Sequence, residues 1–489
     1  MTFTEFNEFA KTYRYVPMSR ELMADVLTPV SLFYAIREGA DRPFLFESVE
    51  GGEHLARYSF IGYNPYRELR YEQGKVLLED LKVGKVESLD ESYFSALKRL
   101  TQTLDSPKIA DLPKFTGGAV GFSSYDTILE LEGISISAAN TLELPEAVWA
   151  FYNKLYAFDH VKHRILLIHL VDVNAFSYTE DAYKAAIGEL DEMQQRAHNT
   201  FKADTKVQID PAKIESNMDQ ATFETAVDKI KKHIYEGDIF QGVFSQRFHT
   251  DFEGDAFMLY RALRMVNPSP YLFFIENPQF NLIGSSPEVL VSVENGEARV
   301  LPIAGTRPRG KNEAEDLAFE QDLMADTKEQ AEHIMLVDLG RNDMTRVCDP
   351  KTVHVSKSAY VERYSHVMHI VSEVRGQLDK SLSPVDALMR CAPAGTVSGA
   401  PKIRAMQIIN DLEPTKRGPY AGAVGYFDHF GNMDTCIAIR TMVAKNNKIY
   451  IQSGAGIVAD SVPTSEYEET VNKAKALFAA MEKALQITF

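Results

Sequence analysis

The sequence predicts an α+β protein built on antiparallel sheets. Short runs of β-forming residues, separated by turn residues, follow one another through roughly the first 200 residues. In the second half, strand-like runs are often linked by short turns, which favours antiparallel pairing over regular βαβ alternation. Long helical patterns are mixed with these strands, so we expect large sheets accompanied by separate helices.

The first half of the chain is expected to be rich in sheet. Strands are predicted at 45–46, 58–61 and 165–171, and a helix at 178–199. The polar stretch 200–219 includes Pro211, carries little periodicity and is typical of a connection. We therefore expect an N-terminal domain at 1–205 and a C-terminal domain at 215–489.

The second half begins with a predicted amphipathic helix at 221–236, which ends at Gly237, and continues into a β-forming run at 241–248. Further helices are predicted around 326–337 and from a start between 461 and 465. Further strands are predicted at 280–283, 289–293, 422–427, 435–443 and 449–452.

Composition and charge exclude several classes of protein. The 489 residues include 69 acidic and 52 basic ones, which leaves a formal charge of −17. This balance speaks against nucleic acid or an anionic membrane as a partner, and an anionic substrate must meet a local basic or metal site. The N-terminus does not resemble a signal peptide, and three scattered cysteines fit a reducing compartment. We expect a cytoplasmic protein.

Two pairs of glutamates are candidates for a metal site. Glu329 and Glu332 are three residues apart in one predicted helix, and Glu466 and Glu469 have the same spacing in the last helix, so each pair lies on one helical face. Carboxylate oxygens of this kind suit Mg²⁺. Acidic residues in a first helical turn also complement the helix dipole, and exposed pairs are common on solvated faces, so either interpretation fits a single pair.

Glycine-rich turns and single polar residues are less specific. The segments AGTRPRG (304–310), PAGTVSGA (393–400) and SGAG (453–456) can bring backbone amides close to a carboxylate or phosphate, but each also fits an ordinary tight turn. His369 lies in an alternating apolar run, where a buried core histidine is the simpler interpretation. By the same standard Glu288 fits a strand edge, Tyr420 a structural ring and Arg440 a surface cation.

Many segments together closely resemble the large subunits of anthranilate synthase, within the family of chorismate-utilising enzymes. The resemblance is dense over the second half and reaches the first half through two motifs. The motifs are LFESVEGGE (45–53), RYSFIG (57–62), GDIFQGVFSQRF (237–248), NPSPYLFF (267–274), GSSPEVLV (284–291), PIAGTRPRG (302–310), AEHIMLVDLGRND (331–343), ERYSHVMHIVSEV (362–374), PAGTVSGAPKIRAM (393–406), RGPYAGAVGYF (417–427), MDTCIAIRT (433–441) and SGAGIVADS (453–461).

The resemblance implies a large antiparallel β-sandwich flanked by helices, with the active site in the C-terminal half. It also implies a lyase reaction, the first committed step of tryptophan biosynthesis. Chorismate is aminated at ring carbon 2 with loss of the C4 hydroxyl, and pyruvate is then eliminated to leave anthranilate. The amino group comes from glutamine through a separate amidotransferase subunit, so we expect a heteromer, while free ammonia can replace that subunit in vitro.

The resemblance also assigns roles to residues of this chain. Glu288 matches the acid that protonates the departing hydroxyl, His369 the histidine of the elimination step, and Thr396 a residue that faces the ring. Tyr420 and Arg440 match the pair that binds the enolpyruvyl carboxylate. The chorismate-contacting loop positions are Gly305, Thr306, Gly454, Ala455 and Gly456, and the Mg²⁺ ligands are Glu332 and Glu469, with Glu329 and Glu466 in the inner or water-bridged shell.

Two positions separate branches of the family. Relatives that add water to chorismate carry a lysine base at the position of Gln241, and a neutral amide there favours ammonia as the nucleophile. Many aminodeoxychorismate synthases of the folate pathway carry a reactive lysine at the position of Ala304, and its absence favours anthranilate synthase. That sister branch stays an alternative, because not all of its members have the lysine.

The resemblance implies feedback inhibition by tryptophan. The strips that form the family's tryptophan site correspond here to Ser48 in the motif LFES (45–48) and to Pro270, Tyr271 and Leu272. A catalytically silent tryptophan sensor is a second alternative, which the intact set of acid, metal ligands and substrate-binding residues disfavours. A metal-dependent phosphohydrolase lacks the aspartate and histidine clusters of two-metal sites.

Overall fold

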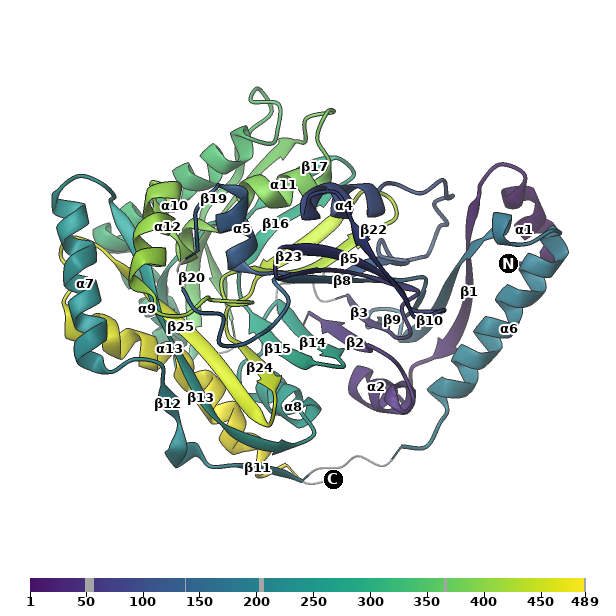
Figure 1. Cartoon of the computed structure of the whole chain (residues 1–489), viewed down its shortest axis with the longest axis horizontal. Coiled ribbons are helices and arrows are strands. Elements are labelled where there is room, and N and C mark those ends of the chain that lie inside the picture. Colours follow the sequence, from purple (N-terminus) through teal and green to yellow (C-terminus); the bar gives the residue numbers. More distant parts are fainter. Residues whose placement is uncertain (49–56, 137, 202–205, 365–366, 488–489) are drawn as a thin grey trace.

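Two large antiparallel sheets pack face to face in the computed structural model of the chain, which describes residues 1–48, 57–136, 138–201, 206–364 and 367–487. Every pair of neighbouring strands within the two sheets is antiparallel. The predicted α+β class and the sandwich architecture are confirmed (Figure 1).

The first sheet has 13 strands. In spatial order they are β1 (Tyr15–Met23), β10 (Arg164–Asp172), β9 (Lys154–Asp159), β3 (Tyr58–Gly62), β2 (Phe44–Glu47), β14 (Tyr271–Asn277), β15 (Phe280–Ser286), β24 (Thr441–Lys445), β25 (Lys448–Ile457), β13 (Gln241–Gly254) and β11 (Val207–Ile209), with β12 (Glu215–Ser216) and β21 (Gly399–Ala400) paired to β13.

The second sheet has 12 strands. Their order is β18 (Ile303–Pro308), β20 (Val367–Gln377), β17 (Glu297–Val300), β16 (Val289–Glu294), β23 (Met433–Ile437), β22 (Ala423–Asp428), β7 (Gly118–Ser123), β8 (Ala147–Tyr152), β4 (Arg67–Glu72), β5 (Lys75–Asp80) and β6 (Lys85–Leu89), with β19 (His354–Arg363) paired to β20.

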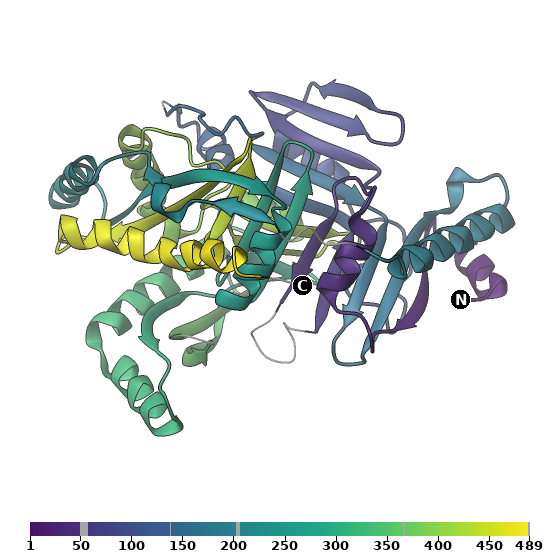
Figure 2. The same ribbon diagram turned by 90° about the horizontal axis from the view of Figure 1, so that it is seen from below.

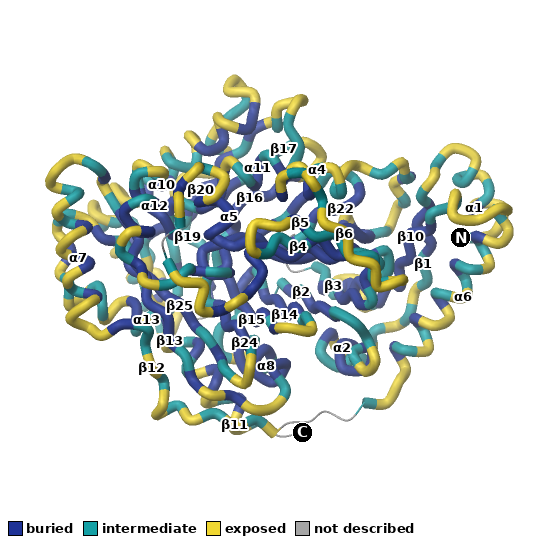
Figure 3. Tube along the Cα trace, viewed as in Figure 1, coloured by how far each residue is buried: buried dark blue, intermediate teal, exposed yellow. Residues whose placement is uncertain are grey.

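Apolar side chains between the sheets form the central core. Phe44, Phe273 and Leu282 of the first sheet pack with Phe122 and Val424 of the second. Because side chains alternate along a strand, the opposite face of each sheet needs its own cover. Figure 3 shows this arrangement as buried strands inside a surface of more exposed helices and loops.

Helices supply that cover. The outer face of the first sheet packs against α1 (Phe3–Ala10), α2 (Pro29–Arg37), α6 (Thr179–Ala197), α8 (Phe257–Val266) and α13 (Pro463–Ala484). The outer face of the second packs against α4 (Tyr93–Leu100), α5 (Tyr125–Leu131) and α11 (Pro384–Cys391). Figures 1 and 2 place α1 and α6 at one end of the molecule and α7 (Gln220–Tyr235) at the other.

The remaining helices lie near the end of the sandwich that carries the predicted site. Helix α7 and α12 (Lys402–Leu412) pack against β13 and β25, while α9 (Glu313–Ala325) and α10 (Thr327–Thr345) cover β18 and β20. Three short 3₁₀ turns complete the elements, η1 (Val173–Ala175), η2 (Pro211–Lys213) and η3 (Gly395–Val397). Within the described part of the chain, none of the helices is long and apolar enough to cross a membrane.

Strands from both halves of the chain share each sheet. In the first sheet β2 pairs with β14, and in the second β7 pairs with β22. The predicted connection at 200–219 contains the short strands β11 and β12, which add to the edge of the first sheet. The division into domains at 1–205 and 215–489 stays a prediction.

One predicted strand is wrong. The run at 435–443 was expected to be continuous, but the chain leaves the second sheet after Ile437 and enters the first sheet at Thr441. Arg440, with φ of 50°, marks the change of direction. The apolar run hides this corner because residues on both sides of it are buried in the same sandwich.

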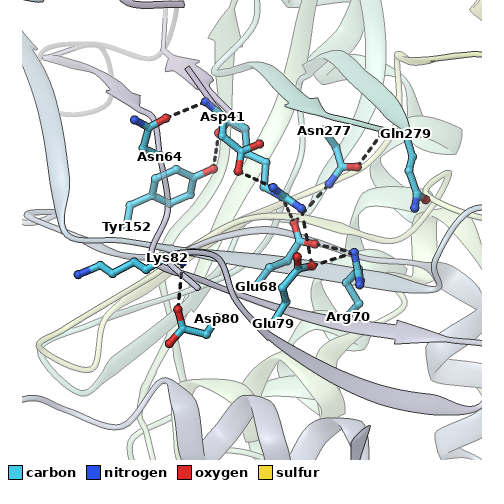
Figure 4. A network of polar contacts seen from close by, with 11 residues as sticks. Asp41, Asn64, Glu68, Arg70, Glu79, Asp80, Lys82, Tyr152, Asn277 and Gln279 are labelled. Carbon is cyan, nitrogen blue, oxygen red and sulfur yellow. Dashed lines mark hydrogen bonds and ion pairs between the residues drawn. The ribbon is translucent and has the colours of Figure 1, made fainter. Parts of the chain in front are cut away.

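A buried carboxylate links the two sheets through polar contacts (Figure 4). Glu68 of β4 is fully buried and accepts hydrogen bonds from Arg42 Nε at 2.7 Å and from Asn277 Nδ2 at 3.3 Å. Arg70 lies 3.3 Å from both Glu68 and Glu79. Since Arg42 precedes β2 and Asn277 ends β14, this network links the second sheet to the first.

Candidate functional site

Two of the predicted site residues lie where the chain crosses from one sheet to the other. Glu288 follows β15 of the first sheet and precedes β16 of the second, and Arg440 lies between β23 and β24. The two crossings touch, because Ser285 N–H donates to the Arg440 carbonyl at 3.1 Å and Ile437 N–H donates to the Glu288 carbonyl at 3.0 Å. The site is therefore built at a corner of the sandwich.

Glu288 has the surroundings of a proton donor. Its carboxylate Oε2 accepts a hydrogen bond of 2.9 Å from the Thr396 hydroxyl in η3. Burial raises the pKa of Glu288, while the bond from Thr396 and the charges of Lys473 and Arg440 act in the opposite direction. The net rise favours the protonated carboxyl, which a general acid needs.

His369 has the complementary character. It lies in β20, half-buried, and burial lowers the pKa of its imidazole. Its Nδ1 is 2.9 Å from the carbonyl oxygen of Gly305 and 3.1 Å from the Thr306 hydroxyl. Because a carbonyl can only accept, Nδ1 carries the hydrogen of the neutral ring, and Nε2 keeps the lone pair that a base requires.

Gly305 owes its place to an irregularity in β18. The register between β18 and β20 shifts between Ala304 and Thr306, and Gly305 has φ of 72°. A Cβ there would lie 3.2 Å from Glu329 Oε2. The positive φ thus favours glycine here, and the glutamate lies close against it.

Tyr420 and Gly454 lie against each other. Tyr420 is buried between α12 and β22, and a Cβ on Gly454 would come within 2.8 Å of its hydroxyl. The charges of Glu288 and Arg440 both act on the phenol, whose pKa burial raises to about 12. The predicted carboxylate-binding pair and the predicted acid therefore share one space.

Gln241 begins β13 beside the strand that carries the glycines. Ala455 pairs with Phe244, and a Cβ on Gly456 would lie 2.7 Å from Gln241 Nε2. The side-chain amide thus occupies the space that a side chain at Gly456 would need. This is the neutral position at which water-adding relatives were expected to carry a base.

The four predicted metal ligands lie on α10 and α13, near enough for Glu469 of α13 to act on the charge of Glu332 of α10. Desolvation and the charges of Glu329 and Glu469 raise the pKa of Glu332. Desolvation, opposed by a bond from Ser461 and reinforced by Glu469, raises the pKa of Glu466. Carboxylates that repel one another in this way fit a divalent cation, which relieves the repulsion.

These carboxylates do not converge closely on one point. In the part of the chain that the structure describes, the only set of three acidic or histidine ligands within 4.8 Å of one another is His233, Glu236 and Asp238, at the end of α7. An ion between α10 and α13 would therefore use one or two protein carboxylates together with oxygens of substrate and water, which is usual for Mg²⁺.

Lys473 was missed by the sequence analysis. Its Nζ lies 2.7 Å from Glu469, one helical turn earlier, and donates to the Gly454 carbonyl at 3.0 Å. Its charge lowers the pKa of Glu288 as well as those of two predicted metal ligands. The signal was its spacing of four from Glu469, which places both on one helical face.

A small, partly open cavity of about 60 Å³ adjoins the acid. Glu288 and Thr396 line part of it, and the rest comes mainly from apolar side chains of α10 and the start of β18, including Leu336, Leu339 and Ile303. The residues predicted to contact substrate from the other side, Tyr420 and Arg440, do not line it. The cavity is therefore bounded by the acid but not by the pair predicted to bind the enolpyruvyl carboxylate.

The two strips predicted to bind tryptophan lie side by side. Leu272 of β14 pairs with Glu47, which precedes Ser48, and Leu272 is buried. Tyr271, which follows Pro270, points between the sheets and donates to Asp434 at 2.8 Å. Residues 49–53 of the motif LFESVEGGE, and residues 365 and 366 of another motif, lie outside the described residues.

Known proteins resemble this chain over its whole length. The family described as chorismate binding enzyme matches residues 41–479. Anthranilate synthase component 1 from Acetivibrio thermocellus is 44% identical, with 99% of each chain covered. The same component from Pseudomonas aeruginosa is 43% identical, with 98% of this chain and 97% of the relative covered.

Solved structures share the fold. Anthranilate synthase component I from Streptococcus pneumoniae superimposes with a TM-score of 0.77 at 39% identity, covering 94% of this chain and 99% of its own. The menaquinone-specific isochorismate synthase from Escherichia coli gives a TM-score of 0.69 at 20% identity, covering 99% and 98%, which extends the similarity of fold alone.

Proposed function

The chain belongs to the chorismate binding enzyme family, and from this premise we propose that it acts as the large subunit of an anthranilate synthase. Chorismate and ammonia would give anthranilate, pyruvate and water. The relatives that are 41–44% identical over the whole chain support this assignment, and their designation as component 1 supports a second component as partner.

One observation carries the chemistry of the proposal. A carboxyl whose pKa is raised and an imidazole whose pKa is lowered share one site, and such divergent pairs are how acid and base roles are divided in one active site. Glu288 would give its proton to the C4 hydroxyl, which leaves as water while ammonia bonds to ring carbon 2. His369 Nε2 would then take the proton from carbon 2 as the enolpyruvyl group leaves.

In the proposal, local positive groups bind the anionic substrate of this acidic protein. Arg440 and Tyr420 would hold the enolpyruvyl carboxylate, and a planar guanidinium suits a bidentate grip on such a group. Thr396, Gly305 and Thr306 would line the ring, together with the backbone of Gly454, Ala455 and Gly456. Mg²⁺ held by Glu332 and Glu469, with Glu329 and Glu466 near it, would neutralise the ring carboxylate when bound.

The proposal includes ammonia as the nucleophile and an amidotransferase as its source. Gln241 supports this choice, because its amide cannot deprotonate water but leaves ammonia, already a nucleophile, free to react. The three buried, unpaired cysteines fit a reducing compartment, and the proposal places the protein in the cytoplasm.

The proposal also includes feedback inhibition by tryptophan at Ser48, Pro270, Tyr271 and Leu272. Strand pairing supports this proposal, because it connects the predicted tryptophan site to a predicted substrate-binding residue. Leu272 pairs with Ser285 of β15, and Ser285 donates its N–H to the carbonyl of Arg440. A ligand that displaces β14 against β2 would therefore act directly on a predicted substrate-binding residue.

The test is to incubate the purified chain with chorismate, Mg²⁺ and ammonium and to follow anthranilate fluorescence, with and without tryptophan. We expect a rise in fluorescence that tryptophan suppresses. Chorismate consumption without fluorescence would move the chain to the aminodeoxychorismate branch. Binding of chorismate without consumption would indicate the silent sensor.

A further inference from the structure

Among the arginines that form ion pairs within the described part of the chain, Arg417 has the most deeply buried side chain. Its side chain is 1% exposed, and it forms a two-pronged pair with Glu413, from Nε to Oε2 at 2.8 Å and from Nη2 to Oε1 at 2.7 Å. A buried pair of this kind is weak evidence for a gain in stability, because removing both charges from water is costly. Its other contacts indicate what it does.

The remaining donors of Arg417 reach backbone carbonyls of two site segments. Nη1 donates to the carbonyl of Val397 at 2.7 Å, and Val397 directly follows Thr396 in η3. Nη2 donates to the carbonyl of Val243 at 2.7 Å, two residues after Gln241 in β13. One planar group therefore fixes the distance between the segment that carries Thr396 and the strand that carries Gln241.

Glu413 adds a second hold on the same strand. Its Oε1 accepts hydrogen bonds from the backbone N–H of Ser245 at 2.9 Å and from the Ser245 hydroxyl at 2.7 Å. All of these groups are buried, so loss of one partner leaves polar atoms that water cannot satisfy. The pair thus holds β13 at two positions, Val243 and Ser245.

The segment after Arg417 leads to Tyr420. The guanidinium lies 4.3 Å from the ring centroid of Tyr125 and 5.6 Å from that of Tyr420. Gly418, with φ of 62°, donates its N–H to the buried Asp126 at 2.7 Å, which fixes the turn between Arg417 and the tyrosine. None of these contacts involves a group that would react with substrate.

We propose that Arg417, paired with Glu413, is the positioning residue of this site: it sets the mutual placement of Gln241 and Thr396, and through Thr396 that of the acid Glu288. The inference rests on the proposed function. It predicts that the residue governs the chemical step rather than the binding of chorismate, because misplacement of reacting groups by a fraction of an ångström slows the reaction far more than it weakens binding.

The first experiment compares Arg417→Lys with the wild type in the ammonia-dependent assay. Lysine keeps the charge but cannot span Glu413 and two carbonyls in one plane. We expect kcat to fall by about 10- to 100-fold while KM for chorismate changes by less than about threefold. The alkaline limb of the pH profile, along which Glu288 loses its proton, should move to higher pH by about half a unit, because a loosened Thr396 no longer stabilises the carboxylate.

Two further variants separate positioning from folding. Arg37→Lys is the matched control, since Arg37 also pairs with two carboxylates, Asp255 and Glu276, although it is only half-buried and lies on the outer face of the first sheet. It should lower the melting temperature and leave kcat and the pH limb unchanged. Thr396→Val should move the limb as Arg417→Lys does, and the double variant should move it no further, since both act through one hydrogen bond.

The outcomes are distinct. Equal activity per folded molecule in Arg417→Lys and the wild type, with an unmoved limb, would overturn the proposal and leave Arg417 a structural role. If Arg417→Lys does not fold, Glu413→Gln takes its place with the same expectation, because it keeps an oxygen for Ser245 but weakens the grip on Arg417. Absence of anthranilate from the wild type would contradict the proposed function itself, before any variant is compared.

Discussion

The carbonyl oxygen of Gly305 decides which nitrogen of His369 can act as a base. It accepts the hydrogen of Nδ1 and leaves the Nε2 lone pair for the site. This glycine lies at the point where the pairing of β18 with β20 is irregular. A backbone feature of one strand therefore sets the tautomer of a side chain on the neighbouring strand.

Replacement of His369 by Asn should separate the two halves of the reaction. Without the base, amination proceeds while elimination slows by about 100-fold or more, so an aminated product that retains its enolpyruvyl group accumulates. Mass spectrometry of the products, beside anthranilate fluorescence, measures the ratio. His169→Asn, at a buried histidine of β10, is the control. Equal loss of both products would contradict the assigned role.

Replacement of Glu288 by Gln should lower the activity and raise the stability of the fold at pH 8. We expect kcat to fall by about 10²- to 10⁴-fold, since the amide cannot donate the proton. The pKa of Glu288 is raised in the folded state, so its charge destabilises the fold at pH above that raised value, and the variant should melt at a higher temperature than the wild type at pH 8. The difference should shrink as the pH falls through the raised pKa and vanish below the ordinary pKa of the carboxyl. A lower melting temperature at pH 8 would show that the charged carboxylate stabilises the fold.

Residue patterns predicted some of this site and not the rest. The spacing of Glu329 and Glu332, and of Glu466 and Glu469, indicated two helical faces, but nothing in either helix shows that α10 and α13 meet. The resemblance supplied the acid and the base. Lys473 and Arg417 were missed because their importance lies in contacts with carbonyls of distant segments, which a sequence does not display.

Helices α10 and α13 work as a pair only when both are in place. Each contributes one of the two principal predicted ligands, and burial, then Glu329 on the same helix and, to a smaller extent, Glu469 on α13 raise the pKa of Glu332. A cation that bridges them would also tie the last helix of the chain to the β18 and β20 side of the site. Metal binding and local order of these helices should therefore be coupled.

Glu332→Gln and Glu469→Gln should each raise the Mg²⁺ concentration for half-maximal activity by about 10- to 100-fold. Titration calorimetry with Mg²⁺ alone should show the same loss of affinity. Removal of the ion with a chelator should abolish activity in the wild type and leave it folded. Glu468→Gln, an exposed neighbour on α13, should titrate like the wild type. If all three variants matched the wild type, these glutamates would not be the ligands.

Elements were predicted better than their connections. Periodicity identified α6, α7, α10 and the start of α13, because amphipathic faces repeat within each helix. The corner at Arg440 escaped detection, since strands on both sides of it are apolar. That corner is also where substrate binding is proposed, so the local pattern failed at a position with functional demands.

The contact between the two sheets depends on the Glu68 network. Removal of one partner of a buried ion pair costs about 3 to 5 kcal/mol, so Glu68→Ala should lower the free energy of unfolding by that amount in urea titration. Glu87→Ala, at an exposed position of β6, should change it by less than about 0.5 kcal/mol. Equal effects would mean that Arg42 and Asn277 do not anchor the sheets through Glu68.

The whole molecule should unfold as one unit. Because β2 pairs with β14 and β7 with β22, neither half can complete its sheets alone. We expect a single calorimetric transition, and we expect residues 1–205 or 215–489, expressed separately, to lack the dispersed amide spectrum of a folded protein. A folded, chorismate-binding fragment 215–489 would instead support the division predicted from the sequence.

Sequence patterns could not predict that both halves of the chain share each sheet, because the paired strands lie far apart in the chain. Local patterns identify a strand and the face that it buries, but they carry no information on which distant strand completes its hydrogen bonds. The interval between β2 and β14 exceeds 200 residues. Only the resemblance to whole proteins, rather than any pattern within either half, implied the sandwich.

The same interval matters while the chain is being synthesised. At roughly 5 to 20 residues per second, β2 leaves the ribosome roughly 10 to 45 seconds before its neighbour β14 exists. During that time one edge of β2 has no strand to pair with, and an unpaired apolar edge invites association with other chains. A chaperone should therefore matter most while only the N-terminal part of the chain has been synthesised. Slow translation of the region between the two strands should lower the yield of folded protein.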